Sequence, residues 1–96
     1  MNQHRYSAHR NLRAINFVCN APQAKSVSLV GDFNNWDPAA NPMERRPEGA
    51  WLLNFELRHG HHRYAFFVDG VITLDPRAQG ITRNDQGQRV SLVPVS

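Results

Sequence analysis

Apolar and polar residues alternate along much of this chain, and this pattern is typical of β-strands. The clearest run covers residues 51–58, in which the odd-numbered side chains are all apolar. Successive side chains of a strand point to opposite faces, so these apolar positions would share one face. That face would consist of Trp51, Leu53, Phe55 and Leu57, and the opposite face of Leu52, Asn54, Glu56 and Arg58. We therefore expect Trp51 in a core.

Similar alternation predicts strands in other segments, which are residues 15–20, 27–33, 64–68, 72–74 and 90–95. In the last of them, the side chains that face the core are either Val90, Leu92 and Pro94 or Ser91, Val93 and Val95. Turn residues separate the strands at 47–49, 59–60, 69–70 and 86–87. Asp69-Gly70 lies between two apolar strands and favours a type I′ hairpin turn, which needs positive φ at both positions.

No segment has the apolar stripe and the caps of a helix. Short strands about ten residues apart predict an all-β fold, an antiparallel β-sandwich with an immunoglobulin-like arrangement. The chain has 96 residues, of which 41% are hydrophobic and 20% charged, so it can bury one modest core. We expect a single β-sandwich domain at residues 14–96.

The positive charge of the chain is concentrated near its amino-terminal end. Arg5, Arg10 and Arg13 have no acidic neighbour within residues 1–13, whereas the other eight Lys and Arg residues are balanced by eight Asp and Glu residues. We predict that residues 1–13 form a basic, flexible arm, which is either solvated or touches phosphate, an acidic lipid surface or an acidic protein. Nucleic-acid binding is not expected, because the folded part is neutral overall.

The single cysteine and the hydropathy of the chain indicate in which cellular compartment the protein is expected. Cys19 is the single cysteine, so it cannot form an internal disulfide, and in its apolar run we expect a small buried residue in a reducing compartment. No apolar stretch approaches the roughly 20 residues of a membrane span, and the basic amino terminus lacks the apolar core of a signal peptide. We therefore expect a cytoplasmic protein without membrane contact.

A second tryptophan stands in a predicted turn. The segment Gly31-Asp32-Phe33-Asn34-Asn35-Trp36-Asp37-Pro38 follows an apolar run. Asn34 and Asn35 tolerate left-handed backbone conformations, and Pro38 prevents the strand from continuing. We therefore expect Trp36 at a loop tip, outside the core, where a rigid turn would hold its indole ring as a flat surface for stacking.

Several motifs follow this turn in order. They are Asn41-Pro42-Met43, Gly49-Ala50-Trp51, Gly60-His61-His62-Arg63-Tyr64, Phe66-Phe67-Val68-Asp69-Gly70, Asp75-Pro76 and the tail from Asn84 to Val95. Together with the turn around Trp36, they resemble the glycogen-binding, or family 48, carbohydrate-binding modules. Such modules precede the catalytic barrel in isoamylases and branching enzymes and also occur in the beta subunit of AMP-activated protein kinase. The resemblance runs from about Asn16 to Val95 and implies an immunoglobulin-like sandwich of the early-set type.

The resemblance also implies a function. A glucan chain presents apolar C–H faces and hydroxyl edges, so its binding site needs an aromatic plane with a few polar side chains around it. In the glycogen-binding modules the tryptophan of this turn stacks on a glucose ring, which implies that role for Trp36. The polar candidates around it are Asn34, Asn35, Asn84, Gln86 and Gln88. We expect a non-catalytic module that binds α-glucan, such as glycogen, starch or maltooligosaccharide, in about the millimolar to high micromolar range.

Two positions depart from the pattern of the kinase subunit. Ala65 stands where that subunit has a lysine against sugar hydroxyls, and Ile72 replaces a second tryptophan shortly after the Asp-Gly turn. An alternative function is therefore a protein-interaction module, which keeps the fold and docks on a glycogen-handling enzyme or on a second copy of itself. Phe67 and Leu52, each out of phase with its apolar neighbours, are candidates for an apolar outer patch or for edge residues under the amino-terminal arm.

The sequence does not indicate catalytic chemistry. His59, His61 and His62 flank a predicted turn and lack a further ligand at a suitable spacing, so we expect no metal site. Each of four aspartates has a turn role that explains it without glycoside hydrolysis, and these are Asp32, Asp37, Asp69 and Asp75. No nucleophile and base pair and no glycine-rich phosphate loop stand out. We expect no catalytic residue and no cofactor.

Overall fold

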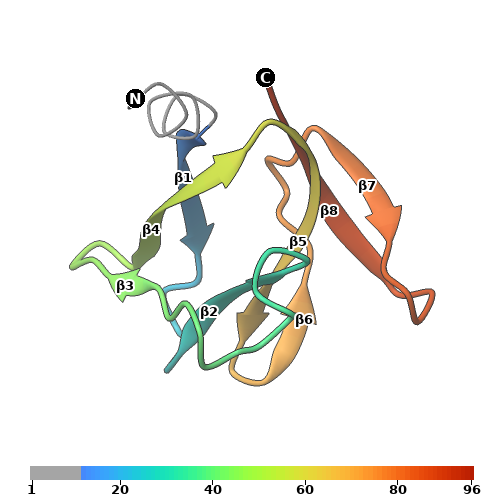
Figure 1. The fold of residues 1–96 in the computed structure, drawn as a ribbon. Helices are drawn as coiled ribbons and strands as arrows, with labels where there is room; N and C mark the ends of the chain where they lie inside the picture. The colour runs from blue at the N-terminus through green and yellow to red at the C-terminus, as the bar shows by residue number, and fades with distance from the viewer. Residues whose placement is uncertain (1–11) are drawn as a thin grey trace.

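The computed structural model describes residues 12–96, which form two antiparallel β-sheets (Figure 1). The strands of this part of the chain are β1 (Leu12–Asn20), β2 (Val27–Gly31), β3 (Glu44–Arg45), β4 (Ala50–Arg58), β5 (Gly60–Val68), β6 (Val71–Thr73), β7 (Gly80–Arg83) and β8 (Arg89–Val95). Residues 1–11 of the predicted basic arm lie outside the described residues, and Arg13 belongs to β1. Within residues 12–96, no helix has the length and apolarity needed to cross a membrane.

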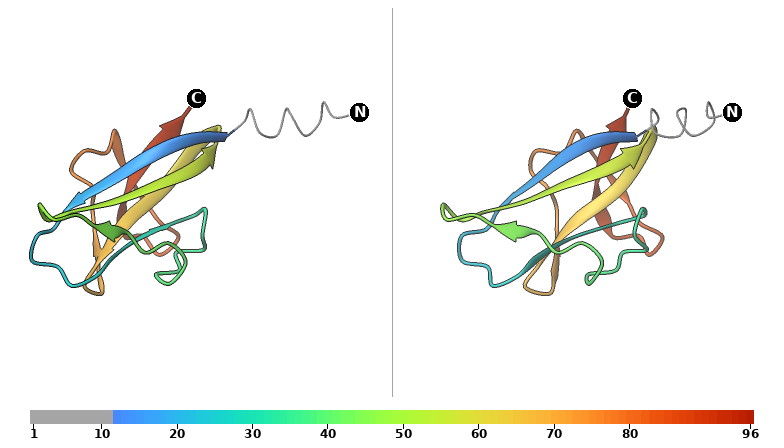
Figure 2. Two further views of the ribbon diagram at one scale, coloured as in Figure 1. Left: turned by 90° about the vertical axis from the view of Figure 1, so that its left-hand side faces the viewer. Right: turned by 60° about the vertical axis from the view of Figure 1, so that its left-hand side comes forward.

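The strands are arranged in two layers. One sheet has the order β1-β4-β3, and the other has the order β2-β5-β8-β7, with β6 also paired to β5. Every pairing between these strands is antiparallel. Turned views show the two sheets facing each other (Figure 2). The structure thus confirms the predicted all-β, immunoglobulin-like sandwich.

The main core lies between the two sheets. Its buried members are Phe17, Cys19, Ala24, Val27, Leu29, Met43, Trp51, Leu57, Tyr64, Phe66 and Val95. Leu53 and Phe55 pack against them, so the apolar face predicted for residues 51–58 is confirmed. Cys19 is buried as predicted, and burial, followed by the charge of Asp75, raises the pKa of its thiol.

A second, smaller cluster lies on the other face of the five-stranded sheet. It is built on Val30 of β2, Ala65 of β5 and Val90 of β8, each at most 1% exposed. Val30 and Ala65 are directly paired across their two strands. These three residues are called the outer cluster below. Their position shows that β5 supplies apolar side chains to both faces of the sheet.

Strand β8 faces the main core with Ser91, Val93 and Val95, which is one of the two predicted alternatives. Val93 and Val95 pack into that core. The hydroxyl oxygen of the fully buried Ser91 accepts a hydrogen bond from the Asp75 N–H at 2.8 Å. Asp75 in turn accepts a hydrogen bond from the Tyr64 hydroxyl at 2.6 Å. These bonds fix the segment that follows β6 against the core.

The β5–β6 turn has the predicted geometry. Asp69 and Gly70 have φ of 48° and 85°, and positive φ at both positions is what a type I′ turn requires. Two strands were not predicted from the sequence. Strand β3 consists of two charged residues, and β7 has one large apolar side chain, Ile81, which is 55% exposed at the edge of the sheet. Alternation cannot reveal strands this short or this exposed.

The stability of the fold at alkaline pH should depend on Tyr64. Burial, then the hydrogen bond to Asp75 and its charge, raises the pKa of Tyr64 above its ordinary value of 10.0. The protonated Tyr64 hydroxyl therefore stabilises the folded state. This stabilisation is complete below about pH 10 and is lost as the pH rises toward the higher pKa of Tyr64 in the folded state. In urea denaturation, we expect the stability of the wild type to fall above about pH 10 more steeply than that of Tyr64→Phe. Equal alkaline slopes in the two proteins would contradict this role.

Truncation of Trp51 should destabilise the fold by about 3–5 kcal/mol. The indole is 6% exposed, and its Nε1–H donates to the Ala21 carbonyl at 3.0 Å, so Trp51→Ala leaves both a cavity and an unpaired carbonyl. Urea denaturation followed by circular dichroism measures the loss. Val71→Ala is the control, because Val71 is 61% exposed and should change stability by less than about 0.5 kcal/mol. Similar stabilities of the two variants would refute the assignment of Trp51 to the core.

Candidate functional site

The loop that carries Trp36 is a compact turn after β2. The Gly31 carbonyl accepts hydrogen bonds from the N–H groups of Asn34 at 3.1 Å and Trp36 at 2.9 Å. Asn35 and Trp36 have φ of 58° and 57°. The left-handed conformation predicted for Asn34 and Asn35 therefore occurs at Asn35 and, in place of Asn34, at Trp36. A large side chain rarely adopts positive φ, so the surrounding contacts must hold Trp36 in this conformation.

The side chain of Asn34 holds this turn together. Its Oδ1 accepts a hydrogen bond from the Gly31 N–H at 3.0 Å. Its Nδ2 donates to the Leu29 carbonyl at 3.0 Å and to the Asn41 Oδ1 at 2.8 Å. The Asn34 amide is thus committed to contacts within the protein, whereas Asn35 is exposed at the surface.

Trp36 rests on the outer face of the five-stranded sheet. Its half-buried indole packs, with Phe67 and Ile72, against the outer cluster. Trp36 therefore lies outside the main core, but its ring is supported by the sheet and does not project from a free loop tip. Ala65 presents only a methyl group at this point of the sheet, which leaves room for larger apolar side chains above it.

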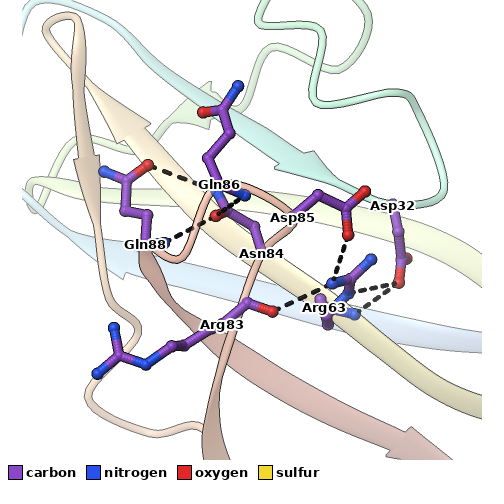
Figure 3. A network of polar contacts seen from close by, with 7 residues as sticks. All are labelled: Asp32, Arg63, Arg83, Asn84, Asp85, Gln86 and Gln88. Carbon is purple, nitrogen blue, oxygen red and sulfur yellow. Dashed lines mark hydrogen bonds and ion pairs between the residues drawn. The ribbon is translucent and has the colours of Figure 1, made fainter.

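The other predicted site residues form one short loop between β7 and β8. The Oδ1 of Asn84 accepts hydrogen bonds from the backbone N–H groups of Gln86 at 3.0 Å and Gln88 at 2.9 Å. Its Nδ2 lies 3.4 Å from the Oε1 of Gln88 (Figure 3). Asn84 therefore shapes the loop, and the exposed Gln86 and Gln88 side chains remain at its surface.

Arg63 of β5 connects the two loops (Figure 3). Its Nη1 donates to the Arg83 carbonyl at 3.1 Å and to the Asp85 Oδ1 at 3.3 Å, both next to Asn84. Its Nε lies 3.7 Å from the Asp32 Oδ2, at the start of the tryptophan turn. The backbones also meet there, because the Asp32 N–H donates to the Arg63 carbonyl at 3.0 Å and the Arg63 N–H donates to the Asp32 Oδ2 at 3.0 Å.

Gly31 permits this close approach of the turn to β5. A Cβ at Gly31 would lie 2.5 Å from the Phe33 ring and 2.6 Å from the Arg63 carbonyl oxygen. At both distances, a side chain at position 31 would have to displace its neighbours. Glycine at this position therefore lets the turn start directly beside Arg63.

Sequence reasoning missed Arg63 and its two carboxylate partners as part of the candidate site. The bridge joins positions far apart in the chain, and no local motif marks it. A usable signal was the alternation of β5, since Arg63 lies two residues before Ala65 and therefore on the same face.

Within the part of the chain that the structure describes, no group of three or more His, Cys, Asp or Glu side chains could hold a metal ion. The Nε2 of His62 lies 2.8 Å from the Arg58 carbonyl oxygen, and its Nδ1 lies 3.7 Å from Asp32. Asp37 accepts a hydrogen bond from the Ala39 N–H within its own turn, as predicted. Asp69 instead accepts hydrogen bonds from the N–H groups of Lys25 and Ser26, in the loop before β2.

Comparisons with known proteins relate this chain to glucan-modifying enzymes. The family model for carbohydrate-binding module 48, the isoamylase N-terminal domain, matches residues 4–78. A 1,4-alpha-glucan branching enzyme of Protochlamydia amoebophila is 49% identical over 80 residues, which are 77% of this chain and 11% of that protein. One of Xanthomonas campestris pv. campestris (strain 8004) is 36% identical over 83 residues, which are 86% of this chain and 11% of that protein. The chain thus spans about a tenth of the length of these curated relatives.

Removal of the Asn34 amide should destabilise the protein by about 1–3 kcal/mol, because its partly buried partners lose their hydrogen bonds. Urea denaturation of Asn34→Ala measures this loss, and the indole N–H resonance of Trp36 should broaden as the turn loosens. The matched control is Asn35→Gly, since glycine adopts positive φ freely. Wild-type stability and a sharp Trp36 resonance in Asn34→Ala would show that Asn34 does not hold the turn.

Proposed function

The chain belongs to the carbohydrate-binding module 48 family, and we propose that its β-sandwich is a non-catalytic module that binds α-glucan through Trp36. The observation that carries the proposal is an indole ring supported by the sheet on a turn with an internal hydrogen-bond network. The names of the relatives, 1,4-alpha-glucan branching enzymes, support α-glucan as the ligand class.

The glucan lies across the outer face of the five-stranded sheet, with one glucose ring on Trp36. The apolar C–H face of the sugar packs on the indole, and Phe67 and Ile72 extend the apolar surface beside it. The exposed side chains of the 84–88 loop supply hydrogen bonds to hydroxyl groups at the edge. An aromatic plane with a polar rim has the composition that a sugar site needs.

Asn34 and Asn35 have different roles in this proposal. The three hydrogen bonds of the Asn34 side chain fix the turn before the ligand arrives, so little conformational entropy is lost on binding. Asn35, adjacent to Trp36 and exposed, is available to contact sugar hydroxyls directly. A mutation of Asn34 therefore acts through the position of Trp36, and a mutation of Asn35 acts on the contact itself.

The affinity of this site is low. One aromatic stack contributes on the order of 1 kcal/mol beyond the burial of area, and part of the indole is already covered by the protein. With a few hydrogen bonds added, the dissociation constant falls in about the millimolar to high micromolar range. Such a site acts by keeping an attached protein near a polysaccharide that offers many equivalent binding positions.

A second candidate function, docking on another protein, is favoured by a hollow of about 620 Å³ on the three-stranded sheet. Its lining consists of Asn16, Phe17, Val18, Pro42, Glu44, Leu52, Leu53 and Asn54. Leu52 is one of the two residues predicted for an outer apolar patch, whereas Phe67, the other, lies on the opposite sheet beside Trp36. A glycogen-handling enzyme or a second copy of the chain could use this hollow without covering Trp36.

Titration with maltoheptaose, followed by amide chemical shifts, tests the glucan-binding proposal. We expect saturable shifts at residues 33–37 and 84–88 in the wild type, weaker binding in Trp36→Phe, which keeps an aromatic plane, and none in Trp36→Ala. Circular dichroism should show that Trp36→Ala remains folded, because Trp36 is not part of the main core.

The outcome that contradicts the proposal is an absence of shifts in the wild type at millimolar maltoheptaose. Sedimentation of Leu52→Asp beside the wild type would then test self-association through the three-stranded sheet. Cellohexaose, which has β-linkages, is the control sugar for the wild type, and equal shifts with it would argue against a preference for α-glucan.

A further inference from the structure

We propose that Arg63 contacts the glucan directly and is the cationic hydrogen-bonding group of the site. The inference rests on the function proposed above and extends it to a residue of the central strand. Arg63 lies on the outer face of β5, two residues before Ala65 of the outer cluster that supports Trp36. Its side chain therefore starts on the same face of the sheet as the stacking surface.

Protein groups contact the guanidinium group of Arg63 at two of its three nitrogens, Nη1 and Nε. The two hydrogen bonds of its Nη1, to the Arg83 carbonyl and to Asp85, orient the planar group, and Asp32 lies beside its Nε. Its Nη2 has no hydrogen-bond partner within residues 12–96. Nη2 carries two N–H donors, and the Arg63 side chain is 30% exposed at the surface where a ligand would bind.

The neighbouring carboxylate complements these donors. The Asp85 side chain is 91% exposed, so only a small part of its acceptor capacity is used by Arg63. Adjacent hydroxyl groups of a glucose ring can donate one hydrogen bond and accept another at the same time. The free Nη2 of Arg63 and the exposed oxygens of Asp85 together provide a donor and an acceptor for such a pair, with the added strength of charged partners.

Arg89 offers a matched control within the same sheet. It directly precedes Val90, whose side chain belongs to the outer cluster, so the alternation of β8 directs Arg89 to the opposite face. Arg89 is exposed and is paired across the strands with Arg83. Arg89→Gln therefore removes the same charge from the neighbouring strand without removing the proposed contact.

The experiment compares Arg63→Gln, Arg63→Lys and Arg89→Gln in the full chain by titration with maltoheptaose. Loss of a hydrogen bond from a charged group should weaken binding about tenfold or more in Arg63→Gln, and Arg89→Gln should stay within about twofold of the wild type. Arg63→Lys keeps the charge and its attraction to Asp85. A lysine has no second terminal nitrogen to replace Nη2, so this variant should also bind the sugar more weakly. Amide hydrogen exchange at Gln86 and Gln88, measured without sugar, reports whether the 84–88 loop stays closed.

The inference is supported if Arg63→Lys binds more weakly while the exchange at Gln86 and Gln88 stays at the wild-type rate. Unchanged binding in both Arg63 variants would overturn it and leave the proposed function standing. Equal losses in Arg63→Gln and Arg89→Gln would also overturn it, because net charge would then explain the effect. If the wild type binds no maltoheptaose, the proposed function fails, and the contact with Arg63 fails with it. If Arg63→Gln does not fold, the comparison of Arg63→Lys with Arg89→Gln decides.

Discussion

The alternation of side chains along β5 determines where the core lies and where the candidate site lies. Tyr64 and Phe66 point between the sheets and belong to the main core. Arg63, Ala65 and Phe67 stand on the opposite face. A shift of one residue in the pairing of this strand would turn the charged Arg63 into the core and expose two buried aromatic rings. The pairing that buries the core therefore also fixes the composition of the outer face.

The loops around this face depend on β5 for their positions. The turn before Trp36 is joined to the strand at Asp32, through bonds to both the backbone and the side chain of Arg63. The second loop is joined to it at Asp85. Within the first turn, the Asn34 amide holds the backbone in a conformation that a tryptophan rarely adopts. Residues on a regular strand thus position the side chains of two loops, which favours a preformed binding surface over one assembled by the ligand.

The strands that could be predicted from the sequence are those in which apolar and polar side chains alternate. Strands with several apolar residues were found for this reason, and so was the place of Trp51 in the core. The charged β3 and the exposed β7 carry no such pattern. The motif around Trp36 predicted a turn, but not the roles of its side chains. Those roles depend on contacts between distant residues, such as the one between Asp32 and Arg63, which are 31 positions apart. Local sequence cannot reveal which side chain of a turn is used internally and which remains for a ligand.

In the proposed complex, one face of a glucose ring lies on the indole of Trp36. Saturation-transfer difference NMR with maltoheptaose tests it most directly, because saturation passes only between protons in close contact. We expect transfer from the aromatic protons of the wild type to the C–H protons of one sugar face, and loss of this transfer in Trp36→Ala. Transfer of equal strength in Trp36→Ala, or no transfer to the sugar in the wild type, would show that Trp36 is not the stacking surface.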